Sequence, residues 1–204
     1  MKYAMTHLPL EHFLQCFQLS GNRPSKGLLH LASFLGQSEI VSTSLNCGAQ
    51  VDERDPTEAT PLHYAAWNNE DADVVKILLM AQADPNSAYE EGRTVLHHAT
   101  FKNSSLEMIS TLLAAGADVK ATCRNGTTAL FSICIGAGAM QKLVEAGADV
   151  KVVDRDGGTE LHAVVWSGDP DASKILIDAG ADPNAMNERR MTPLHWATAT
   201  SDNS

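Results

Sequence analysis

Thr60-Pro61-Leu62-His63-Tyr64-Ala65-Ala66 is the stretch that decides the fold, because copies of it recur along the chain at a nearly constant spacing. Close copies begin at Thr94, Thr159 and Thr192, and weaker ones begin at Gly27 and Thr128. Successive starts are separated by 33, 34, 34, 31 and 33 residues. A period of this length indicates a solenoid built from one repeated supersecondary unit.

A second signature keeps a fixed distance from the first. It is rich in alanine, glycine and aspartate, and its copies read Asn46-Cys47-Gly48-Ala49, Ala81-Gln82-Ala83-Asp84-Pro85-Asn86, Ala115-Gly116-Ala117-Asp118-Val119, Ala146-Gly147-Ala148-Asp149-Val150 and Ala179-Gly180-Ala181-Asp182-Pro183-Asn184. Both signatures recur with the same period, so each indicates the same repeat independently of the other.

Each unit predicts two short helices. Thr60 is a favoured N-cap, and Pro61 suits the first helical position because the N–H that it lacks would have no helical partner. Apolar residues at helical spacing predict a second helix, as at Val74, Ile77 and Leu78. A glycine after that helix supplies the left-handed conformation that ends it. One such pair cannot bury its apolar face alone, so several must stack.

These motifs resemble the ankyrin-repeat family over residues 25 to 200. The resemblance implies an all-α solenoid of helix-turn-helix units with β-turn fingers, with about five and a half repeats in residues 25–204. The repeats start near 25, 58, 92, 126, 157 and 190. Residues 1–24 lie outside the repeat phase, and Leu10, Phe13, Leu14 and Phe17 share one helical face there. We expect an N-terminal capping helix in 1–24.

The sixth repeat contains only its first helix before the polar stretch 198–204. Either this is a small natural cap or the chain is cut from a longer protein. We favour the second interpretation, because no second helix shields the fifth repeat.

Composition narrows the classes of partner. The formal net charge is −10, from 25 acidic and 15 basic residues, which disfavours nucleic acid and anionic membranes. No apolar run is long enough to cross a bilayer. The four cysteines show no metal-ligand spacing, and we expect reduced thiols rather than two disulfides. We therefore expect a cytoplasmic protein that is monomeric on its own.

No pattern predicts catalysis, a metal or a cofactor. Five of the eight histidines, at positions 30, 63, 97, 162 and 195, recur with the repeat and so serve the structure. The family resemblance implies that this imidazole bonds backbone between adjacent turns. The segment 154–158 begins like a calcium loop, but Val165 stands where the loop needs an acid, so a turn is expected. The segment 136–139 is also expected to be a tight turn.

The resemblance places a partner, a peptide or a helix, in a concave groove formed by the fingers and first helices. One position there is occupied in the first five repeats by Phe34, Trp67, Phe101, Ile135 and Trp166. Asn68 and Lys102 follow two of these residues. Helices pack about 8–10 Å apart, so this aromatic row spans on the order of 35 Å. The row either binds the partner or packs between repeats, and we favour binding.

The fingers carry uneven charge. Acids dominate the first finger, whereas later fingers offer arginines; the candidate contact residues are Asp55, Glu90, Arg93, Arg124, Arg155 and Arg189. If functional, this pattern orients a ligand with its basic end over the first two repeats. A solvated surface without such a role is the alternative.

We therefore expect a non-catalytic scaffold or adaptor that binds another protein. One alternative is a regulatory ankyrin domain cut from a larger channel, enzyme or ligase adaptor. Another is a substrate of an asparaginyl hydroxylase, because Asn86 and Asn184 follow a leucine and an Asp-Pro pair in a pattern that such enzymes modify. An ordinary turn asparagine explains the same pattern.

Overall fold

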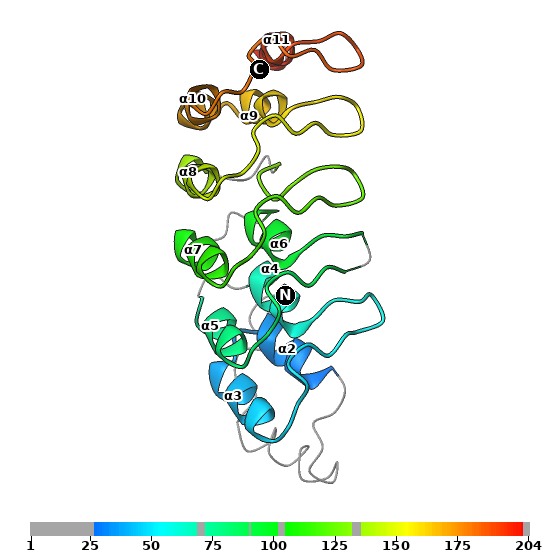
Figure 1. The fold of residues 1–204 in the computed structure, drawn as a ribbon, viewed down its shortest axis with the longest axis vertical. Coiled ribbons are helices and arrows are strands. Elements are labelled where there is room, and N and C mark those ends of the chain that lie inside the picture. The colour runs from blue at the N-terminus through cyan, green and yellow to red at the C-terminus, as the bar shows by residue number, and fades with distance from the viewer. Residues whose placement is uncertain (1–26, 69–71, 90, 102–104, 132–135, 202–204) are drawn as a thin grey trace.

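A computed structural model describes residues 27–68, 72–89, 91–101, 105–131 and 136–201. Within them, helices stack in two parallel columns, with hairpin fingers projecting from one side (Figure 1). The capping helix expected in 1–24 lies outside the described residues.

The first helices of the repeats form the middle column of Figure 1, and the second helices form the column on the left. The first helices are α2 (Leu28–Phe34), α4 (Pro61–Asn68), α6 (Val95–Phe101), α9 (Glu160–Ser167) and α11 (Pro193–Ser201). The second helices are α3 (Ser38–Asn46), α5 (Asp73–Met80), α7 (Leu106–Ala114), α8 (Ala137–Glu145) and α10 (Pro170–Asp178). The predicted all-α solenoid is confirmed.

The threonine and histidine of the motif start each first helix together. Thr60 donates its backbone N–H to Nδ1 of His63 at 3.1 Å, and its hydroxyl lies 2.9 Å from the same atom. This is the side-chain half of a capping box with histidine in place of the usual glutamate, and Thr159 with His162 forms the complete box. Three other repeats copy it, in Thr94 with His97, Thr159 with His162 and Thr192 with His195.

The other ring nitrogen of the histidine ties neighbouring repeats together. Because Nδ1 accepts a backbone N–H, Nε2 carries the proton and donates. His97 reaches Thr127 O at 3.2 Å and His162 reaches Met191 O at 3.0 Å, each in the next finger. His30 does the same toward Ala59 O. The expected bond to the neighbouring turn is confirmed for His30, His97 and His162, whereas Nε2 of His63 has no hydrogen-bond partner within the described residues.

One core runs through the described repeats. The motif leucines Leu29, Leu62, Leu96, Leu130 and Leu161 are almost fully buried, as are Leu78, Leu112, Leu143 and Leu176 of the second helices. Leu194, the same motif position in the sixth repeat, is 71% exposed. Within the described residues no second helix packs against α11 to cover it.

Second helices end in a left-handed residue, as predicted. It is glycine at 48, 116, 147 and 180, where φ lies between 88° and 95°. The second repeat differs, because Gln82 occupies this place with φ 69°. A side chain in this conformation is strained by about 1–2 kcal/mol.

Gln82→Gly should therefore stabilise the protein by about 1 kcal/mol, since glycine adopts this conformation freely. We expect the melting temperature to rise by roughly 2–4 °C. The matched reverse change, Gly116→Gln, should lower it by a similar amount. Equal melting temperatures for wild type and both variants would contradict the assignment of strain to Gln82.

The fourth repeat departs from the others. Its described residues 128–131 contain only a turn at Ala129 and Leu130 where other repeats begin a helix. Phe131 replaces the histidine and cannot donate to the next finger. The tight turn expected at 136–139 is wrong: Gly136 is the N-cap of α8, and Gly138 lies inside that helix beside Leu106.

We expect local opening to begin in this repeat, because it lacks the imidazole bond and carries a glycine in a helix, which costs up to roughly 1 kcal/mol. Backbone amides of α8 should exchange with solvent faster than those of α4 and α5. Hydrogen exchange followed by mass spectrometry measures both regions in one experiment. Equal protection of the two regions would contradict the expectation.

Candidate partner-binding face

Three members of the aromatic row lie exposed at the ends of first helices. Trp67 in α4 is 42% exposed, Phe101 in α6 is 55% exposed and Trp166 in α9 is 56% exposed. Phe34 at the end of α2 is half-buried. Ile135, Lys102 and Glu90 lie outside the described residues, as does the side chain of Asn68.

Each tryptophan of the row also leans on the next repeat. The Trp67 ring lies 4.9 Å from the ring of His98, and the Trp166 ring lies 6.2 Å from that of Trp196. Phe34 meets Tyr64 at 6.3 Å in the same way. The rings thus combine inter-repeat packing on one side with an exposed surface on the other, whereas the sequence interpretation treated these as alternatives.

The contacted residues form a second row that the sequence analysis missed. Tyr64, His98 and Trp196 each follow the motif position of His63 by one residue. Aligning the repeats shows this row in the sequence, because three of them carry a ring at that position. It was overlooked because that position is variable, holding Ala163 in the fifth repeat.

Asp55 is committed to its own finger. Its Oδ1 accepts hydrogen bonds from the backbone N–H groups of Thr57 and Ala59, and its Oδ2 accepts from the Tyr64 hydroxyl at 2.7 Å. Burial raises the pKa of this carboxyl, but the donated hydrogen bonds outweigh burial and hold the pKa below its usual value. The same bond to Asp55 raises the pKa of Tyr64 to about 12. Asp55 therefore stabilises its own finger, and its contact with a partner stays a prediction.

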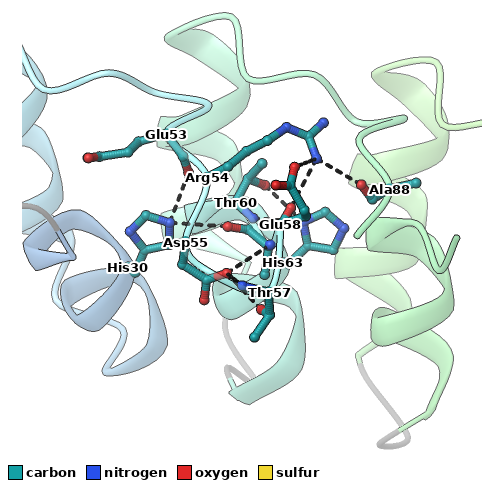
Figure 2. Close-up of polar contacts among 10 residues, drawn as sticks. His30, Glu53, Arg54, Asp55, Thr57, Glu58, Thr60, His63 and Ala88 are labelled. Atoms are coloured by element: carbon teal, nitrogen blue, oxygen red, sulfur yellow. Dashed lines mark hydrogen bonds and ion pairs between the residues drawn. The ribbon is translucent and has the colours of Figure 1, made fainter. Parts of the chain in front are cut away.

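Arginines of the fingers tie adjacent fingers together. Figure 2 shows Arg54, whose Nη1 donates to Glu58 O and, across to the next finger, to Ala88 O at 2.9 Å. Arg155 donates to Arg124 O at 2.8 Å in the preceding finger. Arg93 pairs with Glu91 within its finger, and the side chains of Arg124 and Arg189 are exposed. Contact of these arginines with a partner stays a prediction.

The two candidate asparagines differ in their surroundings. Asn86 accepts a hydrogen bond from Asp118 N at 2.7 Å and donates to Gly116 O, so its amide clamps the second repeat to the third. Asp52 makes the matching bond to Asp84 N one repeat earlier. The side chain of Asn184 is exposed and makes no hydrogen bond within the described residues. Hydroxylation of either asparagine stays a prediction.

A buried aromatic cluster lies beneath Trp67. His98 contacts His63 at 5.5 Å, Tyr89 at 4.8 Å and Trp67 at 4.9 Å between ring centroids. The Nε2 atoms of His63 and His98 are buried without a hydrogen-bond partner within the described residues. Burial lowers the pKa of His63 to about 4 and that of His98 to about 3. The two imidazoles are therefore neutral packing groups at neutral pH.

The described residues contain no cluster of histidine, cysteine, aspartate and glutamate that could hold a metal. None of their helices is long and apolar enough to span a membrane. Cys47 is exposed and Cys123 is buried, and neither forms a disulfide.

Comparison with known proteins agrees with the repeat geometry. A family model described as ankyrin repeats, in three copies, matches residues 10–89, 29–123, 66–154 and 132–204. The chain belongs to the ankyrin-repeat family. Ankyrin repeats are generally protein–protein interaction modules and are typically not catalytic.

The ankyrin-repeat chain is similar to the crystal structure of the ankyrin repeat domain of Bcl-3, described as a unique member of the IkappaB protein family. The two share 25% sequence identity with a TM-score of 0.71, over 92% of this chain and 87% of the other. The curated proteins contain no match.

Proposed function

We propose that this ankyrin-repeat protein is a scaffold or adaptor that binds a peptide or helix of another protein along its first helices and fingers. The observation that carries the proposal is the exposed aromatic row. Trp67, Phe101 and Trp166 present large apolar surfaces at one repeated position. Aromatic side chains of this kind dominate the binding energy of protein interfaces.

Exposed apolar residues on the second helices can be compared with the aromatic row on the first helices. Met80 in α5 and Ile177 in α10 are exposed, but they are flexible or aliphatic and do not occupy one repeated position. Isolated exposed residues of this type are normal on protein surfaces. We therefore assign the partner to the face of the first helices.

Affinity capture from a cell lysate tests this assignment. The wild-type chain is compared with two double variants. The row variant carries Phe101→Ala and Trp166→Ala, and the control carries Met80→Ala and Ile177→Ala on the second helices. We expect the row variant to lose a partner that wild type and control both retain. Equal capture by all three chains, or loss in the control, would contradict the proposal.

We also propose that the chain works in the cytoplasm as a monomer. Support comes from Cys47, an exposed thiol that forms no disulfide, because cytoplasmic conditions keep such thiols reduced.

A further inference from the structure

In two of the described repeats, a finger residue contacts the residue nine positions later in the first helix of the same repeat. In the second repeat this pair is Asp55 with Tyr64, joined by a hydrogen bond of 2.7 Å. In the third repeat it is Tyr89 with His98, whose rings lie 4.8 Å apart. In both repeats, a ring from the helix fills the space beside the finger.

The fifth repeat keeps the finger residue but lacks the ring. Asp154 accepts backbone hydrogen bonds from Asp156 and Gly158 through Oδ1, as Asp55 does from Thr57 and Ala59. The helix residue nine positions later is Ala163. Oδ2 of Asp154, the counterpart of the atom that binds the Tyr64 hydroxyl, accepts no hydrogen bond within the described residues.

A pocket of about 260 Å³ opens at this place. Asp154, His162 and Ala163 line it together with three aromatic side chains, Phe131, Trp166 and Trp196. Phe131 occupies the position of His30, whose ring packs edge-on against Tyr64 at 5.6 Å in the second repeat. The pocket therefore offers the two contacts that surround the Tyr64 side chain in the second repeat. One is an aromatic ring beside the phenol ring, and the other is a carboxylate oxygen that can accept the hydroxyl proton.

We propose that this pocket takes a tyrosine side chain of the partner protein, which donates its hydroxyl to Oδ2 of Asp154. The inference rests on the proposed function and specifies one residue of the ligand. Rings prefer edge-to-face packing against other rings, which Phe131, Trp166 and Trp196 offer. A carboxylate in reach of a hydroxyl forms one of the stronger hydrogen bonds in proteins.

The hydrogen bonds that Asp154 already accepts favour a single hydroxyl donor over an arginine. Within the described residues, Oδ1 accepts two backbone N–H groups and Oδ2 accepts none, so an arginine could not make its usual bidentate contact.

Titration of the ¹⁵N-labelled full chain with N-acetyl-tyrosinamide tests the proposal without a partner. The chain has three tryptophans, of which Trp166 and Trp196 line the pocket and Trp67 does not. We expect saturable shifts of the Trp166 and Trp196 indole N–H signals, with Trp67 unchanged. N-acetyl-phenylalaninamide, which lacks only the hydroxyl, should bind about tenfold more weakly or worse.

Three variants complete the test. Asp154→Asn keeps the Oδ1 acceptor of the finger and should weaken the tyrosine probe by about tenfold. Asp55→Asn is the matched control and should leave binding unchanged. Ala163→Tyr should fill the pocket from within and abolish binding. If this last variant fails to fold, the Asp154→Asn result decides.

Equal binding of the phenylalanine probe would overturn the proposal, because the pocket would then recognise only an apolar ring. Tighter binding of N-acetyl-argininamide would also overturn it, because the pocket would then recognise a cation. The absence of any saturable shift would show that the pocket binds none of these side chains. Each of these results leaves the proposed function standing, since partner capture through the aromatic row is measured independently.

Discussion

Lowering the pH from about 7.5 to about 5 should reduce the free energy of unfolding by roughly 3–4 kcal/mol through His63 and His98 alone. Both imidazoles have a pKa near 6.5 in the unfolded chain. In the folded protein, burial lowers the pKa of His63 to about 4 and that of His98 to about 3. Near pH 5 the unfolded chain therefore binds about two protons that the folded chain excludes.

These pKa values also fix the direction in which the free energy of unfolding changes with pH. A depressed pKa contributes stability that is fully present above the unfolded value of about 6.5 and is lost as the pH falls toward the folded values. Within the described residues, Nε2 of His98 is buried without a hydrogen-bond partner that could stabilise the added charge. At His63, burial outweighs the backbone groups of Ser87 and Arg93, which favour the charged form, and keeps the pKa low. The charge of Arg93 opposes protonation of His98, and the charge of Arg54 opposes protonation of His63.

Urea unfolding at several pH values between about 7.5 and 5 measures this loss. His98→Phe removes one titrating group but retains a ring against Trp67 and Tyr89, so it should remove about half of the pH dependence. An unchanged pH dependence in this variant would contradict the assignment to the buried pair.

Trp67→Ala and Trp166→Ala should each weaken partner binding by about 2 kcal/mol or more, which is roughly thirtyfold in affinity. The exposed side of each ring is available to a partner, and truncation removes that surface. The folded state should lose less, roughly 1–2 kcal/mol, because about half of each ring is already in water. A fully buried ring would cost roughly 3–5 kcal/mol.

A thermal melt and a titration with the captured partner separate these contributions. Met80→Ala on α5 is the control and should change neither quantity by much. A stability loss of 3–5 kcal/mol with unchanged affinity for each folded molecule would show that the row only packs between repeats.

The recurring motif predicted the solenoid, the helix starts and the role of the histidines. These features follow from local rules, in which Thr60 caps a helix and His63 bonds back to it. Gln82 shows a limit of prediction from the motif. The expectation that glycine ends each second helix does not cover a repeat in which another residue adopts the left-handed conformation. Gly138 is a second limit, since it lies inside α8 beside Leu106 although glycine has a weak helix propensity.

The candidate site was harder to predict for a physical reason. Asp55 and Arg155 are charged finger residues that look suited to a partner, yet their hydrogen bonds are made within the protein. Such bonds join residues up to about one repeat apart, and no local pattern encodes them. The pocket beside Asp154 arises from a missing ring at Ala163, which becomes visible only when repeats are superposed.

The central claim is that a protein partner lies along the first helices. Amide hydrogen exchange of the chain, with and without the captured partner, tests it most directly. We expect new protection at the C-terminal ends of α4, α6 and α9 and in the fingers. Protection confined to α5, α7 and α10, with those ends unchanged, would contradict it.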